Sequence, residues 1–363
     1  MKFGQFNLMT LPDRSYSQSR VIDEAATMVR MADQIPQFDI AWFAEHHYSN
    51  YSMCPSPLMM ASKCAGLTER IKLGPAVLVL PLYHPVRVAE EIAFLDLLSG
   101  GRSVIGFGSG YQEFEFTGFG LDIEDKLTAF HECWDVIERA LSDGVIGIEG
   151  KSFQLPDRPM VLGLAQDKMP PVFVAGTNPS LVERVAKSGY TTLISPGFQG
   201  LEKMQDLRDQ VDQGYRAAGV DPDGAKIAIH RYIHITEDKR EAQEAAECIR
   251  FIARTISTMV QGTPNMDGPF ITPDPFEGEP SLEQILQNAN VGDPETVAQK
   301  MAAEIRIARP HHYSCFFAIG PMEGARAIRS MERFATEVIP LLEKELGDLD
   351  TLYEPAAGTV AAE

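Results

Sequence analysis

The residues whose types suggest chemistry begin with Glu45, His46 and His47, which directly follow the apolar run FDIAWFA that starts at Phe38. A carboxylate beside two imidazoles can take up and release protons near neutral pH. A zinc pair is the alternative, but neighbouring side chains of an extended strand face opposite sides, and the chain contains no H-E-x-x-H spacing. We therefore expect no metal. One histidine should face a pocket as a general acid or base, and the other should be outward or structural.

A glycine run, Gly106, Gly108 and Gly110, forms a second candidate. It gives G-x-G-x-G at the end of the apolar run 102–107, and it differs from the dinucleotide fingerprint G-x-G-x-x-G because no helix opens directly behind it. Glycines suit a flexible turn. They equally suit a flat ring, such as a flavin, that approaches the backbone too closely for Cβ atoms. Both interpretations stay open.

The turn Gly176-Thr177-Asn178 is a third candidate. It follows the apolar run VFVA, and Pro179 stands where a helix accepts proline in its first turn. The backbone N–H groups of that turn, together with Ser180, can hold a phosphate. Simple capping of the helix by Asn178 or Thr177 explains the same residues equally well.

These candidates depend on the elements around them, and the chain alternates apolar strands with amphipathic helices. Strands are expected at 2–8, 38–44, 71–80, 102–107, 172–175, 190–195, 226–235 and 313–319. Helices are expected at 19–35, 55–67, 86–98, 125–141, 179–187, 199–218, 239–259, 293–308 and 324–342, with a small hairpin near 150–155. The fold class is therefore α/β, and eight strand–helix units predict a (β/α)8 TIM barrel. An open doubly wound sheet is the alternative.

A barrel places the residues that follow its strands around one mouth. The segment 45–47, the glycine loop, the turn 176–178 and Ser195 should therefore meet there.

The composition limits the partners. A formal net charge of −19 argues against nucleic acid and anionic membranes, because phosphates require a basic surface. The five cysteines are scattered without C-x-x-C spacing, which favours small core residues in a reducing compartment. The N-terminal MKFGQFNL lacks a signal-peptide pattern, and no apolar run is long enough to span a bilayer. We expect a soluble, cytoplasmic protein.

In order, the chain contains KFGQF, WFAEHH, IKLGPAVLVLPLYHPVRVAEEIAFLDLLSGGR, GFGSG, PVFVAGTNPSLVERVAKSGY, VGDPETVAQKM and SMERFATEVIPLL. Together these stretches resemble the bacterial luciferase-like family of flavin-dependent monooxygenases over nearly the whole chain. The resemblance implies a barrel that binds reduced FMN (FMNH2), supplied by a separate NAD(P)H:flavin reductase. O2 is the cosubstrate, and a flavin C4a-peroxide then oxygenates a small-molecule substrate such as an aldehyde or ketone.

The resemblance also implies roles for single residues. His46 is the catalytic histidine, and Ala76 and Val77 match a position where the family can carry a non-prolyl cis peptide beneath the flavin ring. The expected cofactor contacts are Glu45, Ala76, Val77, Gly106, Gly108, Ser109, Gly176, Thr177, Asn178, Ser180 and Ser195. Luciferases proper carry a reactive Cys and an Arg where this chain has Gly108 and Ser109, so light emission is not implied.

The Pro- and Gly-rich segment 261–290 falls where the family has a mobile lid, so Phe270 and Phe276 are expected substrate contacts. Residues 1–345 are expected to form one domain and 346–363 a flexible tail. A homodimer is expected through the helices at 55–67 and 86–98.

Two alternatives stay open. The family also contains barrels that use the deazaflavin F420 for hydride transfer without O2, and short motifs do not separate the two branches. A non-catalytic flavin-binding barrel is the other alternative, which the intact Glu45-His46-His47 run disfavours.

Overall fold

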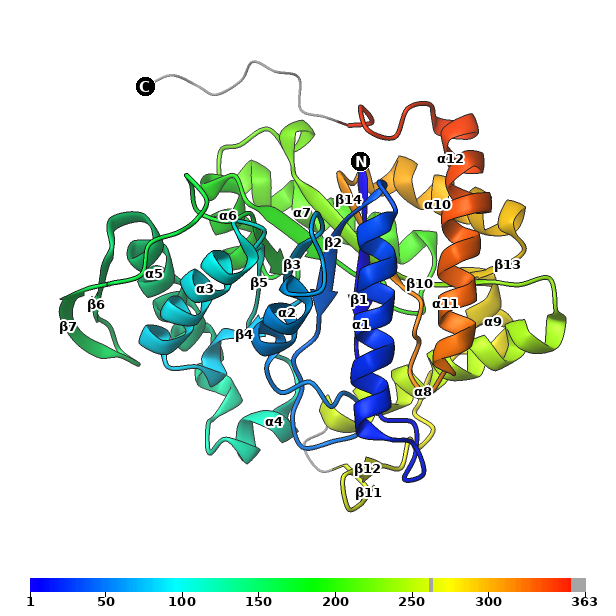
Figure 1. Ribbon diagram of the computed structural model, residues 1–363, viewed down its shortest axis with the longest axis horizontal. Coiled ribbons are helices and arrows are strands. Elements are labelled where there is room, and N and C mark those ends of the chain that lie inside the picture. Colours follow the sequence, from blue (N-terminus) through cyan, green and yellow to red (C-terminus); the bar gives the residue numbers. More distant parts are fainter. Residues whose placement is uncertain (261–263, 354–363) are drawn as a thin grey trace.

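The computed structural model describes residues 1–260 and 264–353. Residues 261–263 of the expected lid and 354–363 of the expected tail lie outside the described residues. Parallel strands form the inner layer and helices the outer layer (Figure 1). Within the described part of the chain, no helix is long and apolar enough to cross a membrane.

The inner sheet is the predicted barrel. Its strands are β1 (Lys2–Asn7), β2 (Phe38–Phe43), β3 (Lys72–Pro75), β4 (Leu78–Val79), β5 (Ile105–Gly108), β8 (Val172–Ala175), β9 (Thr191–Ile194), β10 (Ile227–Ile235) and β14 (His312–Phe316). They are hydrogen-bonded in the order β3-β2-β1-β14-β10-β9-β8-β5-β4. Strands β3 and β4 are the two halves of the strand expected at 71–80, and Leu73 of β3 pairs with Ser103 just before β5. The sheet thus closes on itself. The (β/α)8 barrel is confirmed and the open sheet is wrong.

The predicted helices are confirmed to within a few residues, except that the one expected at 324–342 is divided into two, α11 and α12, by a π-helical turn at Phe334–Val338. They are α1 (Gln18–Gln34), α2 (Pro57–Ala65), α3 (Pro85–Ser99), α5 (Lys126–Asp143), α6 (Pro179–Ser188), α7 (Leu201–Ala217), α8 (Lys239–Val260), α10 (Pro294–Ala308), α11 (Gly324–Arg333) and α12 (Ile339–Leu346). Their ends follow local rules. Ser56 and Asp293 accept hydrogen bonds from backbone N–H groups in the first turns of α2 and α10, and a left-handed Gly100 ends α3.

The sequence analysis did not predict several short elements. They are α4 (Glu113–Gly118), α9 (Leu282–Asn288), β11 (Met266–Asp267), β12 (Phe270–Ile271) and β13 (Asn290–Gly292). The expected hairpin is longer than predicted, with β6 (Val145–Glu149) paired to β7 (Gln154–Pro159). Elements this short carry too few turns or alternations to stand out from loop sequence.

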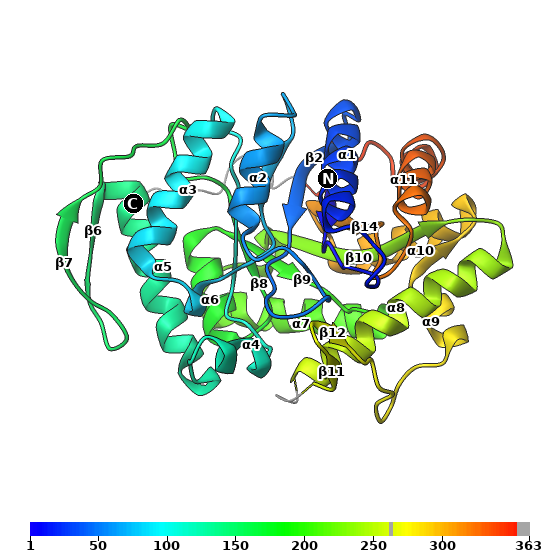
Figure 2. The ribbon, with the colours of Figure 1, turned by 60° about the horizontal axis from the view of Figure 1, so that its bottom comes forward.

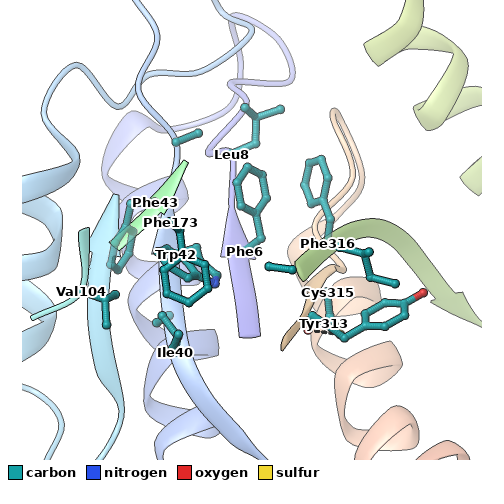
Figure 3. Packing of buried hydrophobic residues seen from close by; sticks show 14 of the residues in the cluster. Phe6, Leu8, Ile40, Trp42, Phe43, Val104, Phe173, Tyr313, Cys315 and Phe316 are labelled. Atoms are coloured by element: carbon teal, nitrogen blue, oxygen red, sulfur yellow. Dashed lines mark hydrogen bonds between the residues drawn. The ribbon is translucent and has the colours of Figure 1, made fainter. Parts of the chain in front are cut away.

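Alternation along the strands builds two apolar layers. Residues that point outward pack under the helices, as Phe3 does edge-on against Phe334 at 5.1 Å between ring centroids. Residues that point inward fill the barrel, where the Trp42 Nε1–H donates to His312 Nε2 at 2.9 Å. Figure 3 shows the inward side chains of Phe6 and Trp42 on neighbouring strands. These side chains fill the barrel interior at the level of Trp42 and below.

The carboxyl ends of the strands carry α4 and the β11–β12 hairpin, which lie at the same end of the barrel in both ribbon views (Figures 1 and 2). Asn50 fixes this hairpin, because its N–H donates to the Pro269 carbonyl at 2.7 Å and its Oδ1 accepts from the Ile271 N–H at 2.9 Å. The hairpin is therefore docked onto the segment that follows β2.

Candidate active site

A cavity of about 530 Å³ opens at the carboxyl ends of the strands. Cavities that bind small molecules span roughly 300–1,000 Å³. Every strand of the barrel contributes to its lining, directly or through the loop that follows it. From the predicted set, the cavity brings together Glu45, His46, Ala76, Val77, Gly108, Ser109, Gly176, Thr177 and Ser195. Gly106, Asn178, Ser180, Phe270 and Phe276 are not part of its lining.

His46 is the histidine that lines the cavity, and His47 does not. The His46 Nδ1 lies 3.1 Å from Glu115 Oε1, and the His47 backbone N–H donates to the same oxygen at 2.7 Å. The side chain of Glu115 is only 4% exposed. The ring of His46 also packs against Tyr51, with centroids 4.7 Å apart. Glu115 therefore fixes the ring orientation of His46 and leaves Nε2 as its free nitrogen.

Glu45 links the ends of two strands through hydrogen bonds. Its Oε1 lies 3.0 Å from His47 Nε2, and its Oε2 accepts from the Tyr83 hydroxyl at 2.8 Å and the Val79 N–H at 3.2 Å. Burial, and then the neighbouring Glu45 carboxylate, raise the pKa of Tyr83, so its hydroxyl remains a donor. His47 thus has a structural role as the partner of Glu45, and the bond from Val79 joins the end of β2 to β4.

The sequence analysis missed Glu115. It lies on α4, and 69 residues separate it from His46 in the chain. Glu113 stands two positions earlier in the same short run, and no pattern in the sequence distinguishes the two carboxylates. Only the position of α4 over the cavity selects Glu115.

The peptide bond between Ala76 and Val77 is cis, at the position that the resemblance indicated. Both residues line the cavity. The neighbouring glycines are explained by this stretch of chain, since a Cβ on Gly106 would lie 2.1 Å from the Pro75 carbonyl oxygen and one on Gly108 would lie 2.3 Å from Val77 Cγ2. The chain from Pro75 to Val77, at the junction of β3 and β4, is thus the element that approaches the glycine backbones too closely for Cβ atoms.

The first turn of α6 lies at the edge of the cavity. Asn178 is the N-cap, and its Oδ1 accepts from the N–H and hydroxyl of Ser180 at 3.1 and 2.8 Å. Gly176 and Thr177 line the cavity, whereas Asn178 and Ser180 are exposed beside it. Capping is therefore established here, and the exposed N-terminal turn still suits an anion.

His230 on β10 is a second cavity histidine that the sequence analysis did not single out. Burial, and then the charge of Arg231, lower its pKa to about 3, so its imidazole is neutral. Ser195 supports the same strand, because its hydroxyl donates to the His230 carbonyl at 3.3 Å. His230 can be recognised as a site residue only from its inward orientation in the structure. A histidine within an apolar strand does not by itself predict a functional site.

The two expected lid phenylalanines have other neighbours. The Arg14 guanidinium carbon lies 4.9 Å from the centroid of the Phe270 ring. The rings of Phe276 and Phe198 have centroids 6.5 Å apart. Their role as substrate contacts stays a prediction. In residues 1–260 and 264–353, no group of three or more His, Cys, Asp or Glu side chains could hold a metal ion.

The fold and the site define a class: a TIM barrel with an apolar cavity at its catalytic end and a histidine–carboxylate pair in its wall. The comparisons then give the family. Residues 1–309 match the model of the luciferase-like monooxygenase family, and the chain belongs to it.

Similar proteins include the uncharacterized protein y4vJ of Sinorhizobium fredii, 30% identical over 96% of this chain and 99% of that protein. The alkanal monooxygenase alpha chain of the Kryptophanaron alfredi symbiont is 23% identical, over 95% of this chain and 99% of that one. The oxygenase component of the flavin-dependent trigonelline monooxygenase of Acinetobacter baylyi is 24% identical, over 96% and 97%.

Solved structures show the same fold. Monooxygenase RslO1 from Streptomyces bottropensis has a TM-score of 0.80 at 23% identity, covering 94% of this chain and 99% of that one. The oxygenating constituent of 3,6-diketocamphane monooxygenase of Pseudomonas putida, in complex with FMN, has a TM-score of 0.72 at 20% identity, over 94% and 98%. The coenzyme F420-dependent tetrahydromethanopterin reductase of Methanopyrus kandleri has a TM-score of 0.69 at 20% identity, over 93% and 98%.

Proposed function

We propose that this protein is the oxygenase component of a two-component FMN monooxygenase. It takes reduced FMN from a separate NAD(P)H:flavin reductase and uses O2 to oxygenate a small aldehyde or ketone. The observation that carries the proposal is the His46–Glu115 pair in the wall of an apolar cavity. The names of the alkanal and trigonelline monooxygenases support it.

The residues present fit FMN. One side of the cavity, at Ala76, Val77, Gly108 and Gly176, is formed by backbone and small side chains, which suits a flat ring with polar edges. The Cβ position of Gly176 has no atom within 4 Å. No lysine or arginine of the described chain lines the cavity, so the phosphate would be held by the N-terminal turn of α6, with its exposed Ser180.

Reduced FMN, when bound, supplies the electrons that activate O2. The chain supplies the proton chemistry. With Nδ1–H donating to the Glu115 carboxylate, His46 presents the lone pair of Nε2 to the cavity and can accept a proton there, or return it once protonated. Apolar side chains around it, among them Leu8 and Val79, keep water from the reacting atoms.

The test supplies the protein with FMN, NADH and a flavin reductase under ¹⁸O2, with decanal and 2-decanone as substrates. We expect one ¹⁸O atom in the product and a loss of about 100-fold or more in His46→Ala, because a positioned acid or base typically contributes about 10²- to 10⁴-fold. An unlabelled product, or full activity in His46→Ala, contradicts the proposal.

The alternatives are outcomes of a parallel experiment that titrates oxidised FMN and F420 and then offers each reduced cofactor with a ketone. Reduction of the ketone by reduced F420 without O2 would replace this proposal with an F420-dependent oxidoreductase. Binding of FMN with no turnover would indicate a non-catalytic flavin-binding barrel.

We also propose a homodimer through α2 and α3, which pack side by side on the outside of the barrel. Exposed apolar side chains gather there: Met59, Leu67, Phe94, Leu97 and Leu98. Burying exposed apolar side chains against a second copy would be favourable. Sedimentation should give twice the chain mass, and Phe94→Glu should give monomers. Monomeric wild-type protein at micromolar concentration would contradict this.

A further inference from the structure

The cavity has a second polar point, on the wall formed by β1, β10 and β14. In the parallel ladders, His230 is paired with Ser314, and Tyr232 with Phe316. Phe6 on β1 faces the same space, with its ring centroid 4.3 Å from that of His230 and 5.0 Å from that of Phe316. These side chains line the cavity away from the Ala76–Val77 side.

The imidazole of His230 is held firmly. Phe6 packs on it at 60° between the ring planes, and Phe316 stacks at 28° with centroids 5.7 Å apart. Its Nδ1 lies 3.1 Å from the Ser314 hydroxyl oxygen. Its Nε2 has no hydrogen-bond partner in the described part of the chain, and it is not among the described buried polar atoms that lack one. Nε2 therefore reaches the cavity.

The protonation of His230 follows from its surroundings. The low pKa keeps the ring neutral, so one nitrogen carries the single proton. When the Ser314 hydroxyl donates to Nδ1, the proton resides on Nε2. A neutral N–H donor in an apolar wall matches a carbonyl oxygen, which accepts without carrying a charge.

The charge of the cavity selects the same class of ligand. The two acids in its lining, Glu45 and Glu115, already accept hydrogen bonds from His47 and Tyr83. Arg231, which follows His230 in the chain, is 1% exposed and paired with Glu304 at 2.7 Å. The lining residues of the β1, β10 and β14 wall are uncharged, so an anion or a cation whose head group lies against that wall would lose its hydration without gaining a counter-ion there, which is costly.

Resting on the proposed oxygenation, we propose that His230 Nε2 binds the carbonyl oxygen of an uncharged substrate whose hydrocarbon part packs on Phe6 and Phe316. His230 is then a substrate-binding residue, separate from the His46–Glu115 pair. The hydroxyl of Tyr232, which also lines the cavity on this wall, is a competing donor and must be tested alongside.

The test uses binding to the full-length protein without flavin or O2, so that it does not depend on turnover. Calorimetry measures the affinity for 2-decanone, for the anion decanoate and for the cation decylammonium, which have equal chain lengths. Carbon NMR of carbonyl-labelled 2-decanone reports the hydrogen bond directly, since donation to the carbonyl moves its resonance downfield. The variants are His230→Phe, His230→Gln, which keeps a donor, and Tyr232→Phe as the matched control.

We expect the ketone to bind at least about tenfold more tightly than either ion, because neither ion finds a counter-charge on the wall that carries His230. His230→Phe should weaken ketone binding by about 5- to 10-fold and abolish the downfield shift. His230→Gln should restore most of both, and Tyr232→Phe should change neither.

Three results would overturn the proposal. They are equal or tighter binding of an ion, an unchanged carbonyl shift in His230→Phe, and failure of the ketone to bind with or without oxidised FMN. The proposed function fails separately. If the ketone binds through His230 but no ¹⁸O enters a product, the subsite stands and the oxygenation is wrong.

Discussion

Glu115 offers the sharpest test of how the site works. Its Oε1 accepts from His46 Nδ1 at 3.1 Å and from the His47 N–H at 2.7 Å, in a side chain that is 4% exposed. Glu115→Gln keeps the shape but replaces a carboxylate acceptor with a neutral amide. A bond to a charged group contributes about 1.5–3 kcal/mol and a neutral one about 0.5–1.5 kcal/mol, so each contact weakens by roughly 1–1.5 kcal/mol.

Two weakened contacts predict a loss of about 2–3 kcal/mol in the free energy of unfolding, measured by urea denaturation. For activity, residues that orient a functional group through a hydrogen bond typically contribute about 10- to 100-fold. We therefore expect kcat/KM with decanal, FMN and the reductase to fall by about 10- to 100-fold in Glu115→Gln.

A double-mutant cycle identifies the route of this effect. If Glu115 acts through His46, adding Glu115→Gln to His46→Ala should cost less than about threefold more. The matched control is Asp33→Asn, a buried substitution outside the cavity that should lower stability and leave kcat/KM unchanged. Full additivity of the two active-site variants, or an equal loss of activity in the control, would refute the reasoning.

Three further predictions concern stability. Burial raises the pKa of Asp33, but N–H groups of residues 69–71 at 2.7–3.0 Å outweigh burial and hold the pKa below its ordinary value. Urea unfolding should therefore show Asp33→Asn less stable by about 1–3 kcal/mol at pH 7, with the gap closing as the pH falls below about 4. Gly106→Ala should lower the melting temperature sharply or prevent folding, because its Cβ would lie 2.1 Å from the Pro75 carbonyl oxygen; Gly163→Ala, with nothing within 4 Å, should be tolerated. The folded-state pKa of His230, about 3, lies below the unfolded value of about 6.5, so the wild type should lose stability relative to His230→Gln as the pH falls from about 6.5 towards 4.

Much of the fold could be predicted because its signals are local. A strand such as 38–43 is a short apolar run, and a helix such as α6 has its own cap in Asn178 and its own stop in Gly189. Eight such strand–helix units leave few architectures other than the barrel. Short elements such as α4 and α9 were not predicted, because one or two turns are too few to show the helical period of apolar residues.

The site divides in the same way. The sequence by itself marked the run at Glu45, His46 and His47, and strand alternation indicated that one histidine would face a pocket. The family resemblance indicated His46, and the tertiary structure places it in the cavity wall. Only the tertiary structure supplies its partner, since barrel closure brings Glu115 to it from a distant helix. The same closure makes His230 an inward-facing, neutral imidazole. Its protonation depends on burial by strands far apart in the chain, and no local pattern of residues encodes that burial.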